Sequence, residues 1–331
     1  MADAPIVVID YHKGNLSSVA RGLVRAGWDN VLVSDDPQEI AVAAGLVLPG
    51  VGSFFDAVTF IRDSGQERAI VTALSCGVPL LGICLGLQVL FARGDEGVPP
   101  EALGERNDVV EELDGTGARR LWVRGLGLFS GSCTRLESAR LKVPHVGWDQ
   151  LHVADAGRDC PLLVGVPEGA NVYFTHSYAV DDDADPSCVA ARTHYVRSFP
   201  CVVWGGAEAS GAQANAYGCQ FHPEKSSGVG LAVLRNFVDV VRRASPLDPR
   251  ARMAALSLLG GAESELGAPD APDLRVPDVS DLGASAAPEP GLEVPVVAEP
   301  ATEASVVAEP AAEASAVSFD SSSDSQNGAS A

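Results

Sequence analysis

A cysteine between two glycines is the strongest candidate for a chemical role in this sequence. Cys84 lies in Gly82-Ile83-Cys84-Leu85-Gly86, after an apolar run at 79–83 that predicts a buried strand and before a predicted helix at 85–92. A G-x-C-x-G motif at such a turn is the thiol counterpart of the nucleophile elbow, in which glycines allow close approach of neighbouring backbones. The dipole of the following helix favours the thiolate. The motif predicts a nucleophile, and a buried structural cysteine is the alternative.

A histidine and a glutamate far along the chain supply the base that a thiol needs. A free thiol, with a pKa of about 8.5, is mostly protonated at neutral pH and requires activation. His222 follows an apolar strand, Pro223 ends that strand, and Glu224 stands two residues further on, where a tight turn lets its carboxylate reach the imidazole. We therefore expect Cys84, His222 and Glu224 to act as nucleophile, base and orienting carboxylate.

Alternating strands and helices are expected to position these residues. Short β-branched runs alternate with amphipathic helical patterns through about residue 120, and this alternation predicts an α/β fold with a central, mostly parallel sheet and helices on both faces. Strands and turns dominate from there to 221, and a last helix is expected near 228–243. The other predicted strands are at 5–9, 31–33, 45–48, 120–124, 171–174, 188–193, 200–204 and 215–221, and the other helices at 16–24, 54–62 and 66–75. We expect one domain over residues 1–245.

The remaining residues, 246–331, differ sharply in composition. They hold 15 acidic and 3 basic side chains, and the segment 296–305 is followed by a near copy at 306–315. Sequence rich in Pro, Ala, Glu and Ser buries too little apolar surface to offset the entropy of ordering. We therefore expect an acidic, largely disordered tail. A short helix at about 249–259 is expected either to dock on the domain or to fray.

Charge and composition exclude several classes of partner. The net charge of −21 argues against binding to nucleic acid or an anionic membrane, which needs clustered Lys and Arg. No apolar run approaches the roughly 18 residues that span a bilayer, and the N-terminus does not resemble a signal peptide. Seven cysteines without a C-x-x-C pair fit a reducing compartment, so a cytoplasmic protein is expected. Because His12, His152 and His194 lack metal-ligand spacing, we expect no metal, and we expect no cofactor.

The cysteine and histidine motifs together resemble those of class I, triad-type glutamine amidotransferases. Other segments, in the same order across residues 10–226, are similar to those of the glutaminase subunits of imidazole glycerol phosphate synthases within that family. The resemblance implies a three-layer, flavodoxin-like domain. The segments that carry it are Asp10–Val19, Leu48–Phe54, Gly125–Leu128, Lys142–Trp148, Tyr173–Tyr178 and Phe221–Ser226.

The resemblance also implies a reaction and a partner. Cys84 would attack the side-chain amide of glutamine and form a glutamyl thioester. Ammonia would pass to a (β/α)₈-barrel cyclase subunit, in a heterodimer that makes imidazole glycerol phosphate and aminoimidazole carboxamide ribotide in histidine biosynthesis. The oxyanion and substrate contacts are expected at Gly50, Val51, Gly52, Leu85, Gln88, Thr175, His176 and Ser177. The partner interface is expected at Asn15, Trp148, Tyr173 and Lys225.

Some features depart from the family pattern and leave alternatives open. Leu87 stands where Met is expected, Asp149 where Asn is usual and Thr175 where Val is usual, and the acidic stretch 94–119 is longer than expected and predicted to be a surface loop. We expect the Gly50–Val51 peptide to be poorly oriented without partner and ligand. The alternatives are the glutaminase subunit of another biosynthetic synthase, or a catalytically silent scaffold of the same fold.

Overall fold

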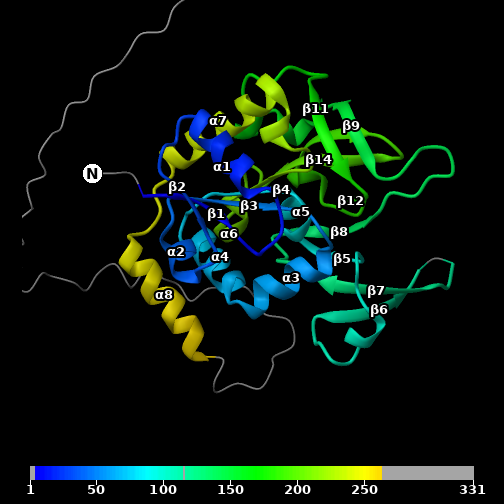
Figure 1. Ribbon diagram of the computed structural model, residues 1–331, viewed down its shortest axis with the longest axis horizontal. Coiled ribbons are helices and arrows are strands. Elements are labelled where there is room, and N and C mark those ends of the chain that lie inside the picture. Colours follow the sequence, from blue (N-terminus) through cyan, green and yellow to red (C-terminus); the bar gives the residue numbers. More distant parts are fainter. Residues whose placement is uncertain (1–3, 115, 263–331) are drawn as a thin grey trace, which may run out of the picture. The chain divides into compact units, whose positions relative to one another are not determined.

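An eight-stranded sheet forms the centre of the computed structural model, which describes residues 4–114 and 116–262 (Figure 1). From one edge to the other its strands are β2 (Val31–Ser34), β1 (Ile6–Ile9), β3 (Gly45–Gly50), β4 (Leu80–Cys84), β15 (Ala216–Cys219), β14 (Ser198–Trp204), β13 (Val189–His194) and β10 (His152–Val153). The first five are parallel and the last three join antiparallel. Every residue of β1, β3 and β4 is buried, as the continuous apolar runs predict for strands covered on both faces.

Helices cover both faces of this sheet and give the three layers that the sequence predicts. On one face, Ile6, Val8 and Ile83 share a hydrophobic cluster with α1 (Leu16–Arg25) and α7 (Ser227–Arg243). On the other face, Val7 and Leu48 share a cluster with α2 (Pro37–Val42), α3 (Phe54–Asp63) and α4 (Gln66–Ser75). The shorter helical turns are α6 (Gly211–Ala214), η1 (Pro100–Ala102), η2 (Asp155–Gly157), η3 (Pro161–Leu163), η4 (Pro186–Cys188) and η5 (Pro223–Lys225).

Two smaller sheets stand beside the central one, and both carry part of the site. One has the order β12 (Tyr178–Val180), β8 (Phe129–Arg135), β5 (Phe91–Gly94), β7 (Arg119–Arg124) and β6 (Val109–Leu113). The other is an antiparallel ribbon of β9 (His145–Gln150) and β11 (Asn171–His176). Figure 1 shows the ribbon and the β6–β7 hairpin projecting on the same side of the molecule.

Two local predictions are wrong for a shared reason. The helix after Cys84, α5 (Leu85–Val89), ends three residues earlier than predicted, because Phe91 already pairs with Phe129 in β5. The segment 94–119 is not simply a surface loop, because β6 pairs antiparallel with β7 along its whole length. In both places, pairing with distant strands overrides the local pattern.

The chain continues beyond the predicted domain boundary as α8 (Pro249–Ala262), which packs on α2 and α4. Arg252 on this helix is only 2% exposed. Its guanidinium donates hydrogen bonds to the carbonyls of Ala41, Val42 and Ala43 at the end of α2, at 2.7–3.2 Å. Of the two expectations for this segment, docking is therefore the one observed. The rest of the predicted tail, 263–331, lies outside the described residues.

Candidate active site

Cys84 occupies a strained backbone position at the end of β4. Its φ of 57° and ψ of −109° lie where side chains are rarely found. The two flanking glycines are required by the turn: a Cβ on Gly82 would lie 2.6 Å from the carbonyl oxygen of Gly86, and one on Gly86 would lie 1.7 Å from that of Leu48. The predicted nucleophile elbow is thus present as a structural feature, and it places the thiol at the C-terminal edge of the parallel strands.

His222 and Glu224 form a buried pair just after β15, the strand next to β4. The imidazole Nδ1 lies 2.9 Å from Glu224 Oε1, and the side chains are 7% and 2% exposed. Because a carboxylate only accepts hydrogen bonds, Nδ1 carries the proton and Nε2 is directed away from the pair. Burial alone would lower the pKa of His222, but the neighbouring Cys84 thiol and the Glu224 carboxylate outweigh it and raise the pKa to about 9. At neutral pH this imidazole therefore carries a proton that it can donate.

The sulfur of Cys84 has two further polar neighbours. The carbonyl oxygen of Thr175, on β11, lies 3.9 Å from Sγ and can accept the thiol proton. The amide Nε2 of Gln220 lies 3.6 Å from Sγ and can only donate to it. Sequence reasoning missed Gln220, although it stands two residues before His222, within the strand predicted at 215–221.

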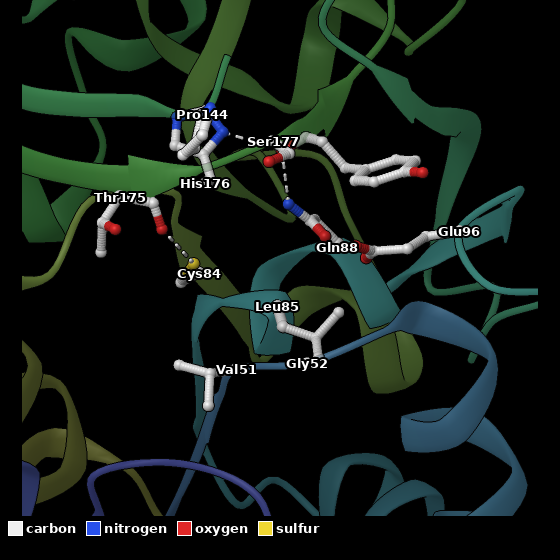
Figure 2. A pocket seen from close by; sticks show the side chains of 11 residues that line it. Val51, Gly52, Cys84, Leu85, Gln88, Glu96, Pro144, Thr175, His176 and Ser177 are labelled. Carbon is white, nitrogen blue, oxygen red and sulfur yellow. Dashed lines mark hydrogen bonds between the residues drawn. The ribbon is translucent and has the colours of Figure 1, made fainter.

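A cavity of about 210 Å³ opens onto Cys84 (Figure 2). Of the eight residues predicted to hold the oxyanion or substrate, seven line it. Gly50 lies beside it on β3, and a Cβ there would fall 1.6 Å from the Tyr11 hydroxyl oxygen. The cavity is lined by Val51, Gly52, Cys84, Leu85, Gln88, Glu96, Pro144, Thr175, His176, Ser177 and Tyr178. Glu96, Pro144 and Tyr178 were not predicted, and Glu96 gave no local signal within its acidic stretch.

Gln88 and Glu96 give the cavity an end rich in acceptors. The Gln88 amide Nε2 donates to the Tyr178 carbonyl at 2.7 Å and to Gln220 Oε1 at 3.0 Å. Gln88 Oε1 is therefore the atom that can accept a hydrogen bond from a ligand. Burial raises the pKa of Glu96 to about 7, although the backbone N–H of Phe54 donates to its carboxylate at 3.3 Å. Figure 2 shows both side chains on the same wall. A cationic ligand group placed there would favour the ionised form of Glu96.

His176 forms part of the cavity wall rather than an acid–base group. Burial lowers its pKa to about 3, and its Nδ1 donates to the Tyr178 carbonyl at 2.8 Å. Its Nε2 lies 3.2 Å from Nδ1 of His145, whose ring stacks on Tyr195. Burial therefore keeps His176 neutral, and the hydrogen bond to Tyr178 fixes the orientation of its ring.

Three of the four residues predicted for a partner interface lie together, and Asn15 is bonded elsewhere. Trp148 is 52% exposed and its ring packs edge-on against Tyr173, with ring centroids 5.9 Å apart. Lys225 Nζ lies 5.9 Å from the centroid of the same Tyr173 ring. Asn15 instead caps α1, where its side chain accepts from the backbone N–H of Ser18.

The described residues hold no candidate metal site and no disulfide. Within residues 4–114 and 116–262, no group of three or more His, Cys, Asp and Glu side chains is arranged to hold a metal ion. All seven cysteines lie in the described segments, are buried, and form no disulfide. No helix in these segments is long and apolar enough to cross a membrane.

Comparisons with known proteins give a consistent result. Residues 7–241 match the family model for "Glutamine amidotransferase class-I". The chain is 41% identical over 236 residues to the "Imidazole glycerol phosphate synthase subunit HisH" of Halalkalibacterium halodurans, covering 71% of this chain and 96% of that protein. Relatives with the same name are 40% identical over 241 residues in a Geobacillus species (71% and 97% covered) and 43% identical over 239 residues in Natronomonas pharaonis (71% and 94% covered).

Proposed function

The chain belongs to the class-I glutamine amidotransferases and, among them, to the group named imidazole glycerol phosphate synthase subunit HisH, and we propose from this premise that it hydrolyses glutamine to glutamate and ammonia for that synthase. The observation that carries the proposal is the Cys84 elbow, which opens into a cavity and ends the strand next to β15, the strand that leads to the His222–Glu224 pair. The arrangement supplies nucleophile, proton donor and orienting carboxylate at one place.

The chemical steps follow from this geometry. The Cys84 thiolate attacks the amide carbon of glutamine, and the C–N bond breaks as His222 gives its proton to the leaving ammonia. Water then hydrolyses the glutamyl thioester to glutamate, with His222 taking the proton back. The oxyanion is held by the backbone N–H of Leu85 and by one from the Gly50–Val51 segment, both next to the sulfur. We propose that this segment is poorly oriented until partner and ligand bind, which would keep resting activity low.

The acceptor-rich end of the cavity recognises the α-amino group of the substrate. Glu96 supplies the negative charge and Gln88 supplies its Oε1 as a second acceptor. Figure 2 shows both side chains to one side of Cys84, so a glutamine held there by its α-amino group directs its side-chain amide toward the sulfur. Thr175 and Ser177 offer backbone groups to the α-carboxylate from β11 and its exit.

The face of the β9–β11 ribbon is the proposed site of the cyclase partner. Val146 and Trp148 are 57% and 52% exposed, and they pair across the ribbon with Thr175 and Tyr173. Directly opposed residues in a ribbon share a face. Thr175 also lines the cavity at Cys84, so this apolar face leads straight to the place where ammonia is released. A barrel-shaped cyclase seated here, in a one-to-one heterodimer, would receive ammonia without loss to solvent.

The experiment is to measure glutamate release from glutamine by the full chain alone, then with a purified cyclase subunit and its ribulosyl ligand. We expect slow release alone and an increase of orders of magnitude with both. The Cys84→Ala variant is the control and should release no glutamate. If wild type releases none under either condition, the chain is a scaffold of the same fold. We also propose a cytoplasmic location, which the seven free cysteines support.

A further inference from the structure

Gln220 is a fully buried polar side chain in contact with the reacting sulfur. It follows β15, is 0% exposed, and its backbone N–H donates to the Cys201 carbonyl at 2.9 Å. Burying an amide costs free energy unless its groups are hydrogen-bonded. Both ends of this side chain are bonded: Oε1 accepts from Gln88 and Nε2 lies 3.6 Å from Cys84 Sγ.

The direction of these hydrogen bonds is fixed by the network, since each step leaves one choice. The Tyr178 carbonyl can only accept, so the group of Gln88 that faces it at 2.7 Å must be Nε2. The second hydrogen of that Nε2 points to Gln220 at 3.0 Å, so Gln220 must present its Oε1 there. Its Nε2 is then the group that faces the sulfur. If the nitrogen and oxygen of either amide were exchanged, two donors or two acceptors would face each other in this network. The atom that faces the sulfur is therefore an N–H donor.

The other neighbours of the sulfur make this donor significant. The Thr175 carbonyl at 3.9 Å accepts from the thiol and so favours the protonated form. The helix that follows Cys84, α5, is only five residues long and offers a weak dipole. His222 supplies a positive charge, but that proton leaves with ammonia during the reaction. Gln220 remains a neutral donor throughout, because an amide does not titrate.

We propose that Gln220 is a catalytic residue of the glutaminase reaction, which stabilises the Cys84 thiolate by donating a hydrogen bond from Nε2 to Sγ. The role rests on the proposed function, and it adds a second source of thiolate stabilisation beside His222. It also connects the cavity to the nucleophile: Gln88 lines the cavity and donates to Gln220, so an ammonium bound at Gln88 Oε1 polarises both amides in series. Hydrogen bonds in series strengthen one another.

The test is the Gln220→Leu variant, which keeps the size of the side chain and removes the donor. The readout is the rate of Cys84 alkylation by iodoacetamide, a neutral probe that reacts with the thiolate, from pH 5 to pH 10. We expect the midpoint of the profile to move up by about one pH unit, which slows alkylation about tenfold at pH values well below the wild-type midpoint. For glutamine, kcat should fall about 10- to 100-fold with KM changed far less. Cys84→Ala gives the background from the other cysteines.

Gln66→Leu is the matched control. Gln66 is also 0% exposed, but its Nε2 donates to the carbonyls of Asp10 and Asp35 instead of a sulfur. It should lose stability without moving the alkylation profile. If Gln220→Leu does not fold, Gln220→Glu serves, and its carboxylate should move the midpoint up further by repelling the thiolate. An unchanged profile in the Gln220 variant, or an equal shift in Gln66→Leu, would overturn the proposal. Because alkylation needs no glutamine, this outcome is distinct from a wild type that releases no glutamate.

Discussion

Changing Glu96 to Gln tests how the cavity recognises the α-amino group of its substrate. Burial raises the pKa of this carboxyl to about 7, so about one-tenth of it is ionised at pH 6 and about nine-tenths at pH 8. Because only the ionised form attracts an ammonium group, kcat/KM for glutamine should be about tenfold lower at pH 6 than at pH 8 in the wild type. The profile of kcat/KM reports groups of the free enzyme, so the acid limb should have an apparent pKa near 7.

In Glu96→Gln the acid limb near pH 7 should disappear. A hydrogen bond to a charged group contributes about 1.5–3 kcal/mol, so kcat/KM at pH 8 should fall about 10- to 100-fold, mostly through KM. The same variant should be more stable than the wild type at pH 8. A carboxyl whose folded pKa is raised binds more protons folded than unfolded, so its stabilisation is present at low pH and is lost as pH rises through about 7.

Asp95→Asn is the matched control for this prediction. Asp95 is the preceding residue, burial likewise raises its pKa, to about 6, and its carboxylate lies 3.6 Å from Arg120. It is outside the cavity lining found in the described part of the chain. The assay is coupled glutamate detection with the cyclase complex from pH 5.5 to pH 8.5. An acid limb that persists in Glu96→Gln, or vanishes in Asp95→Asn, would refute the assignment of Glu96 to the substrate.

Three other changes have expected outcomes. Cys84→Ala should abolish glutamate release while the variant still co-elutes with the cyclase subunit on a sizing column; residual release would place the nucleophile elsewhere. Glu224→Gln should lower kcat about 100-fold without eliminating it, and should move the alkaline limb of the pH profile below 9, because Glu224 helps to raise the pKa of His222. Arg252→Ala removes three hydrogen bonds to α2 and should lower the free energy of unfolding by about 2–3 kcal/mol. Tm should fall by about 4–10 °C while glutaminase activity is retained. An unchanged Tm would mean that these contacts between α8 and α2 do not stabilise the domain.

Local sequence alone was sufficient to predict the elbow at Cys84. The two glycines and the strand-to-helix change lie within five residues, and the close approaches of Gly82 and Gly86 involve the backbone of that turn and of the neighbouring strand. The pairing of His222 with Glu224 was predictable for the same reason, because the proline between them leaves few paths for the backbone. The parallel half of the sheet was predictable from its continuous apolar runs, because such runs are typical of strands that are buried on both faces.

The α8 helix shows where sequence reasoning stops. Its residues were compatible with docking or fraying, because a helix of this length is marginal in water without tertiary contacts. The guanidinium of Arg252 decides between them, since it finds three backbone carbonyls that the end of α2 leaves without helical partners. Those carbonyls belong to residues about 210 positions earlier in the chain.

The sequence by itself determined the layered fold and the three residues that we propose as nucleophile, base and orienting carboxylate, because each of these is encoded by neighbouring residues or by a repeating apolar pattern. Only the tertiary structure brought Glu96 and Gln220 to the site. Glu96 reaches the cavity because the chain after α5 turns at once into β5, and Gln220 meets the sulfur because β15 pairs with β4 in a register that sets Cys219 beside Ile83. Strand register depends on the packing of whole sheets, and a single segment of sequence does not specify it.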